Sequence, residues 1–184
     1  LLKDANDGKA ITLHDAARDR DVTLDDALAQ TDDAMLDTAH EASLTAADLE
    51  GRFDFSSIGL MGHSRGGEGV ASAAVLNAAL DEPWAITSVL PLAPVGFNRF
   101  TIPDVTMMTL LPYCDGDVSN QQGQHMFDDS RYAFDDDVLR SAMWVMGANH
   151  NFFNTVWTPG VYPYSVSDDW SRSTDPVCGT APSV

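Results

Sequence analysis

Residues 58–70 read IGLMGHSRGGEGV, and this stretch decides the fold. A short apolar run leads into Gly-x-Ser-x-Gly, and small residues at helical density follow. This order is typical of a nucleophile elbow, in which a buried strand turns sharply and delivers a serine hydroxyl to the start of a helix. We expect Gly62 and Gly66 to be required, because a Cβ at either position would collide with the neighbouring strand or helix. Ser64 is therefore predicted to be a catalytic nucleophile; the alternative is a glycine-rich turn that merely contains a serine.

Apolar runs and helical patterns alternate along the rest of the chain. Near-continuous apolar strands that alternate with helices indicate a parallel sheet that is buried on both faces, and hence an α/β fold. The predicted strands are 57–61, 86–92, 105–111 and 141–146, and the helices predicted between them are 67–80 and 121–132.

The first fifty residues have a different pattern. Residues 1–22 are polar and weakly periodic, so we expect a loop with at most one helical turn. Two Thr-x-x-Asp sequences, at 23–26 and 45–48, have the spacing of a helix N-cap and its acidic partner. The first is expected to open a helix that runs to about residue 40, and the second a short helix that Gly51 ends.

Composition limits the class of protein. The 184 residues are 44% hydrophobic, which is enough for one sizeable core, and the formal net charge of −18 argues against nucleic acid or an anionic membrane as a partner. No apolar run is long enough to span a membrane, and no signal peptide is visible, although a leader could precede Leu1. Cys114 and Cys178 fit one disulfide of an exported protein; two free thiols are the alternative. No metal-ligand spacing or calcium-loop pattern occurs, so we expect no metal and no cofactor.

Three of the predicted strands end on residues that can perform chemistry. Functional residues gather at the carboxyl ends of the strands in an open parallel sheet, so we expect Ser64, an aspartate of the turn 115–117 and His150 to meet there. Asp117 is the preferred carboxylate, because it follows the turn and can project toward His150. Asp115 is the alternative, although it can instead bind the backbone donors of that turn.

The order Ser, Asp, His predicts nucleophilic catalysis. A serine hydroxyl needs a base to take its proton; His150 is the predicted base, and the carboxylate behind it holds the imidazole in the correct tautomer. The backbone N–H of Arg65 is placed to donate a hydrogen bond to the oxyanion that forms. A second donor is expected from a loop that follows an earlier strand.

Other residues near the motif have plainer interpretations. His63 is expected to pack at the end of its strand rather than to act as an acid or base. Arg65 and Glu68 stand three residues apart and could form a structural ion pair. Phe97 could line an acyl cleft, and a packing role is an equal alternative.

Together these motifs resemble the α/β-hydrolase superfamily, and within it the secreted bacterial esterases that include cutinase-like polyester hydrolases and platelet-activating-factor acetylhydrolase-like lipases. The resemblance covers about residues 50–155 and implies an α/β-hydrolase fold with an open cleft. It also implies that Asp117 is the acid and that Cys114 is bridged to Cys178. The residues that carry it are 58–67, Leu92-Ala93-Pro94, Cys114-Asp115-Gly116-Asp117 and Gly147-Ala148-Asn149-His150.

The resemblance also predicts an incomplete fold. Such a hydrolase has several strands before its elbow, whereas the residues before Ser64 read as helix and loop. We therefore expect one incomplete hydrolase domain over residues 1–184, with a lead-in over 1–50, a catalytic core over 51–155 and an irregular tail over 156–184. The chain would hold the C-terminal half of the fold, and the rest of the protein would supply the missing strands, because the open edges of half a sheet aggregate.

The predicted function is that of a secreted serine esterase or lipase, which cleaves small or polymeric carboxylic esters through an acyl-enzyme. Two alternatives stay open. One is a serine peptidase of the same fold, and the other is a non-catalytic hydrolase-like binding module of a larger secreted assembly.

Overall fold

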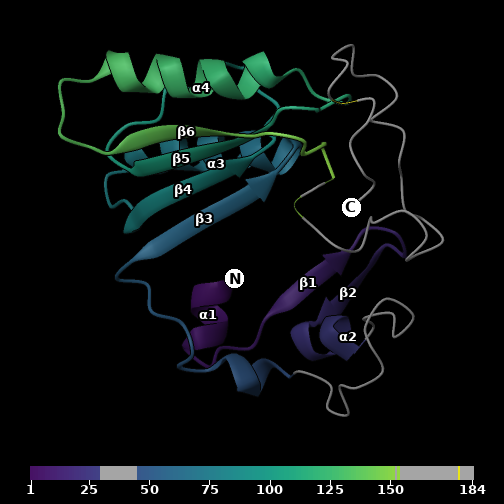
Figure 1. Ribbon diagram of the computed structural model, residues 1–184. Coiled ribbons are helices and arrows are strands. Elements are labelled where there is room, and N and C mark those ends of the chain that lie inside the picture. The colour runs from purple at the N-terminus through teal and green to yellow at the C-terminus, as the bar shows by residue number, and fades with distance from the viewer. Residues whose placement is uncertain (30–44, 152, 154–177, 179–184) are drawn as a thin grey trace. The chain divides into compact units, whose positions relative to one another are not determined.

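The computed structural model describes residues 1–29, 45–151, 153 and 178, and the chain divides into two compact units (Figure 1). The first unit spans Leu1–Ser56 and the second Ser57–Val184. The division lies a few residues after position 51, where the sequence predicts that the catalytic core begins.

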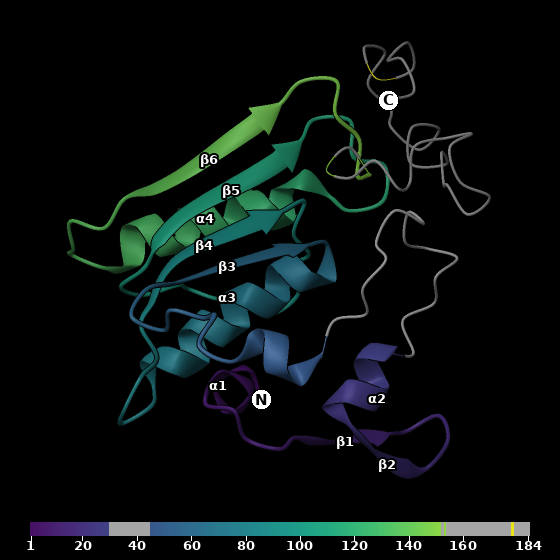
Figure 2. The same ribbon diagram turned by 90° about the horizontal axis from the view of Figure 1, so that it is seen from below.

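The second unit is α/β and contains a four-stranded parallel sheet flanked by helices. The strands follow one another across the sheet in chain order, and their carboxyl ends lie at one edge (Figure 2). The strands are β3 (Ile58–His63), β4 (Ile86–Leu92), β5 (Thr106–Pro112) and β6 (Arg140–Val145), and the helices are α3 (Arg65–Ala78) and α4 (Asn120–Ala133). Each strand and helix predicted for this unit is confirmed to within two residues at either end.

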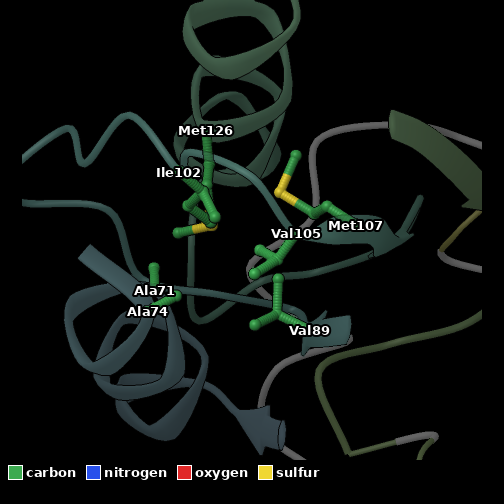
Figure 3. Close-up of a cluster of buried hydrophobic side chains, with 7 residues drawn as sticks. All are labelled: Ala71, Ala74, Val89, Ile102, Val105, Met107 and Met126. Atoms are coloured by element: carbon green, nitrogen blue, oxygen red, sulfur yellow. The ribbon is translucent and has the colours of Figure 1, made fainter. Parts of the chain in front are cut away.

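The core lies between the two helices and one face of the sheet (Figure 3). Small side chains on α3 let this helix approach the strands closely, and Met126 fills the space beneath α4. Burying one large apolar side chain contributes roughly 1.5–3 kcal/mol, so these contacts fasten both helices to the sheet. The buried members are Ala71, Ala74, Val89, Ile102, Val105, Met107 and Met126.

The opposite face of the sheet is less buried. Met61 and Met143 alternate with residues that face the core, and they are 68% and 50% exposed. Both helices of this unit contribute to the core on the first face, so within the described residues the prediction of a sheet buried on both faces is wrong for the second face. β3 is also an edge strand, since among the described strands only β4 pairs with it. The strand that carries the elbow therefore has one side open to a further strand.

The first unit is built from short elements. They are α1 (Leu2–Asn6), the antiparallel strands β1 (Thr12–Asp15) and β2 (Arg20–Thr23), α2 (Leu24–Ala29) and the 3₁₀ helix η1 (Ala46–Leu49). The predicted helical turn is therefore present as α1, whereas the prediction of a loop is wrong where β1 and β2 form. Polar contacts hold the hairpin, including His14 Nδ1 to Asp21 Oδ1 at 3.2 Å and Arg18 Nη1 to Asp15 Oδ2 at 2.9 Å. Such contacts leave no apolar periodicity in the sequence.

Both predicted Thr-x-x-Asp caps form. The Thr23 hydroxyl donates to Asp26 Oδ2 at 2.7 Å, and the Asp26 amide donates to Thr23 Oγ1 at 3.1 Å. The pair at 45–48 makes the matching contacts, and Gly51 follows it with φ +64°. The helix predicted to run to residue 40 begins as α2, and residues 30–40 lie outside the described part.

Two aspartates of the second unit form ion pairs with arginines. Arg99 binds both carboxylate oxygens of Asp129, and Arg140 binds both of Asp136. Within the described residues, no three acidic, histidine or cysteine side chains are grouped to hold a metal ion. Nor is any described helix long and apolar enough to cross a membrane.

Candidate active site

The sharp turn predicted around Ser64 forms where β3 ends and α3 begins. Ser64 joins them with φ 57° and ψ −121°, a backbone conformation that residues other than glycine rarely adopt. The turn is fastened to the end of β4, because the Ser64 amide donates to the Leu92 carbonyl at 2.9 Å and the Ser64 carbonyl accepts from the Val95 amide at 3.1 Å. The sharp turn that the motif predicts is therefore present, and Ser64 holds it in a strained backbone conformation.

The glycines around Ser64 have different surroundings. A Cβ at Gly62 would overlap the carbonyl group of Gly66, so the prediction for Gly62 is confirmed. A Cβ at Gly66 would meet nothing within 4 Å, and the predicted collision there is wrong. The helix is instead closely packed at the next residue, Gly67. Pro94 lies against it, and a Cβ on Gly67 would be 2.6 Å from the Pro94 Cβ.

A buried imidazole–carboxylate pair lies at the carboxyl ends of β5 and β6. His150 Nδ1 donates to Asp115 Oδ2 at 2.8 Å, and the two side chains are only 5% and 1% exposed. The other oxygen, Asp115 Oδ1, accepts from the amides of Asp117 and Val118 at 2.9 and 2.7 Å. Asp115 thus binds the backbone donors of its turn and His150 at once, with one oxygen for each.

Asp117 lies on the other side of the imidazole. Its side chain is 55% exposed, and its Oδ2 is 3.6 Å from His150 Nε2. The position behind Nδ1 that the sequence assigns to Asp117 is therefore occupied by Asp115. The physical reason is the turn itself, whose amides hold the Asp115 carboxylate at Nδ1 of the ring and leave that of Asp117 at the surface.

His63 has contacts that the sequence did not reveal. Its Nε2–H donates to the backbone carbonyl of His150 at 2.7 Å, and the two rings are 4.5 Å apart between centroids. The ring of Phe153 lies 6.0 Å from that of His63. The residue before Ser64 therefore touches the loop that carries His150; its position next to the motif serine was the one signal that could have pointed to it.

A disulfide fastens the loop that carries Asp115. Cys114 and Cys178 are bonded, with their Cα atoms 5.3 Å apart, and both are buried. The predicted bridge is confirmed. The Cys114 amide also donates to the Ala148 carbonyl at 2.8 Å, so the backbone beside Asp115 is joined to the backbone just before His150.

The remaining predicted residues lie at the surface of the site. Arg65 opens α3, where the first backbone N–H groups have no acceptor within the helix. The expected Arg65–Glu68 pair is absent from the described contacts, because Glu68 Oε1 instead accepts from the amide and side chain of Asn98. Phe97 is 72% exposed, which excludes a packing role in the described core.

We expect His63 to make stability depend on pH. Burial holds the pKa of His63 below its ordinary value of 6.5; the nearby charge of His150 adds to this effect, and the hydrogen bond to the His150 carbonyl opposes it. The unfolded chain then binds a proton more readily than the folded one, so this contribution to stability is present above pH 6.5 and is lost as the pH falls through the folded-state pKa.

Thermal unfolding at about pH 7.5 and about pH 5 measures this effect, with the lower midpoint expected at the lower pH. His63→Gln, which cannot titrate, should show a smaller drop. The pKa of carboxylates such as Asp129 is lowered from its ordinary value of 3.8. These groups therefore take up protons below the pH range of this comparison. Equal drops in both proteins would contradict the prediction.

Comparison of the chain with protein-family models and with curated proteins gives no match.

Proposed function

We propose that this protein is a serine hydrolase that cleaves carboxylic esters through an acyl-enzyme. The observation that carries the proposal is the buried 2.8 Å bond between His150 Nδ1 and Asp115 Oδ2. It lies at the same edge of the sheet as Ser64, whose strained backbone is typical of a nucleophile elbow. An imidazole that donates from Nδ1 to a carboxylate carries its lone pair on Nε2, and Asp117 Oδ2 lies 3.6 Å from that atom.

The chemistry follows from these roles. Ser64 Oγ attacks the ester carbonyl while His150 Nε2 takes its proton, and Asp115 stabilises the imidazolium that results. His150 then gives the proton to the departing alcohol, which leaves the acyl group on Ser64. Water, activated by the same imidazole, attacks the acyl-enzyme and releases the acid.

The oxyanion of the tetrahedral intermediate needs hydrogen-bond donors. The Arg65 amide is one candidate, since it lies directly after the nucleophile and at the positive end of the 14-residue helix α3. A single donor is rarely sufficient. We propose that the second comes from a loop that follows one of the earlier strands, as the resemblance to α/β-hydrolases implies.

The substrate and location complete the proposal. The exposed ring of Phe97 follows β4 at the edge where the strands end, so it is available to contact the acyl part of a small or polymeric ester. The Cys114–Cys178 disulfide favours an oxidising compartment, which supports secretion.

Labelling with a fluorophosphonate tests the proposal. This reagent is attacked by activated serines, so we expect one adduct, located on Ser64 by mass spectrometry. Ser64→Ala should remove the adduct and lower ester hydrolysis by about 10⁴- to 10⁶-fold. Ser56→Ala, at an exposed serine of the other unit, is the matched control and should label normally.

Two outcomes would count against the proposal. A folded protein without an adduct on Ser64 would favour the binding-module alternative. Turnover of a peptide nitroanilide in preference to a series of nitrophenyl esters would favour the peptidase.

A further inference from the structure

His63 lies at the junction of the two loops that carry the proposed nucleophile and base. It is the last residue of β3 and directly precedes Ser64. Its side chain crosses to a segment that is 87 residues away in the sequence, where it binds the backbone carbonyl of His150.

The contact is directional and short. A carbonyl oxygen can only accept a hydrogen bond, so His63 Nε2 carries the proton in this 2.7 Å contact. The ring centroids are 4.5 Å apart with the planes tilted by 46°, so the two imidazoles also pack against each other. His63 is therefore held to His150 both by a polar bond and by ring contact.

His150 is therefore held both by its ring and by its backbone. Asp115 binds Nδ1 of its ring, and His63 binds its backbone carbonyl. The first contact fixes how the ring is oriented, whereas the second fixes where its backbone lies relative to the elbow. Neither contact uses His150 Nε2, which is the atom that must accept the proton of Ser64.

We propose that His63 is a positioning residue, whose Nε2–H keeps the His150 backbone at the distance from the elbow that proton transfer requires. This inference rests on the proposed serine hydrolase function. His63 acts through His150 and need not contact the substrate.

The charge state of His63 suits this role. Its pKa is lowered chiefly by burial, so the ring is neutral near and above neutral pH. A neutral His63 still donates from Nε2, and it adds no positive charge beside the imidazolium that forms on His150. The other charged groups that act on His63 are Asp115 and Asp117, both on the loop after β5.

Two substitutions separate the hydrogen bond from the ring contact. His63→Phe keeps a ring and loses the donor, whereas His63→Gln keeps an N–H donor near the position of Nε2 and loses the ring. With a nitrophenyl butyrate substrate we expect His63→Phe to lower kcat about 10- to 100-fold with little change in KM, the scale expected when a catalytic group is misplaced. His63→Gln should stay within about threefold of the wild type, because it keeps the donor.

Equal losses of kcat in the two variants would overturn the inference in favour of ring packing. A change in KM alone would overturn it in favour of a substrate contact. Should His63→Phe fail to fold, the smaller His63→Leu replaces it with the same expected outcomes.

A measurement without substrate keeps the two proposals distinguishable. The Nδ1–H proton of His150, donated to Asp115, is observable by nuclear magnetic resonance in the full chain. We expect this signal to exchange faster with water in His63→Phe than in the wild type or His63→Gln. If the signal responds in this way while the wild type hydrolyses no ester, the positioning role stands and the proposed function fails; an active wild type with an unchanged signal and unchanged kcat in His63→Phe overturns the positioning role.

Discussion

Asp115→Asn should lower kcat about 10⁴-fold, whereas Asp117→Asn should stay within about tenfold of the wild type. The carboxylate of Asp115 accepts from His150 Nδ1 at 2.8 Å in a buried site. An asparagine there can present its amide N–H to Nδ1, which places the imidazole proton on Nε2 and leaves no base for Ser64. Asp117 is exposed and lies on the Nε2 side, so its loss leaves the tautomer unchanged.

The two aspartates form a matched pair, because they lie on one turn and the changes are isosteric. Steady-state hydrolysis of a nitrophenyl ester measures kcat in both variants, and circular dichroism checks that both are folded. In Asp115→Asn the side-chain oxygen can still accept from the amides of Asp117 and Val118, so the turn should survive. If Asp117→Asn proves to be the inactive variant, the assignment of the acid to Asp115 is wrong.

Gly62→Ala should destabilise the fold by about 3 kcal/mol or more, whereas Gly66→Ala should be neutral or stabilise it by up to about 1 kcal/mol. The added Cβ at Gly62 would overlap the Gly66 carbonyl, and both groups belong to backbone that cannot rotate away. At Gly66 the same atom meets open space inside helix α3, where alanine is the better helix former.

Urea unfolding followed by circular dichroism measures both changes, and the wild type provides the slope against which two-state behaviour is judged. The pair tests the elbow geometry directly, since the Gly-x-Ser-x-Gly motif on its own treats its two glycines alike. A larger loss for Gly66→Ala than for Gly62→Ala would contradict this geometry.

The strands β4 and β5 could be predicted because they lie inside a parallel sheet, with a neighbouring strand on each side. Runs such as 86–92 and 105–111 are nearly all apolar, and a strand that contacts neighbours on both sides leaves that pattern in the sequence. The less buried face could not be predicted, because Met61 and Met143 are apolar whether or not a helix covers them.

The hairpin of the first unit could not be predicted, because polar contacts hold it. The strands β1 and β2 have four residues each, and none of them is fully buried. Periodicity reports burial, so a short hairpin that is fastened by His14, Asp21 and the turn at Asp15 gives no such signal. The caps at 23–26 and 45–48 were predictable because a cap is a local contact.

Within the site, the sequence predicts which strands and turns carry the candidate residues, but it does not predict which of these residues bind one another. Asp115 and Asp117 are two residues apart on one turn, and the hydrogen bonds of that turn decide which carboxylate binds Nδ1 of His150. The sequence predicts only a packing role for His63, because its partner is a backbone carbonyl, which every residue has and no sequence pattern marks.

The backbone of Ser64 has a consequence for how this position can change over time. Its conformation at φ 57° and ψ −121° costs a serine roughly 1–3 kcal/mol, and glycine would adopt it with little or no penalty. Selection for stability alone would therefore favour glycine at position 64. Under the proposed function, stability and catalysis therefore place opposite demands on this one residue.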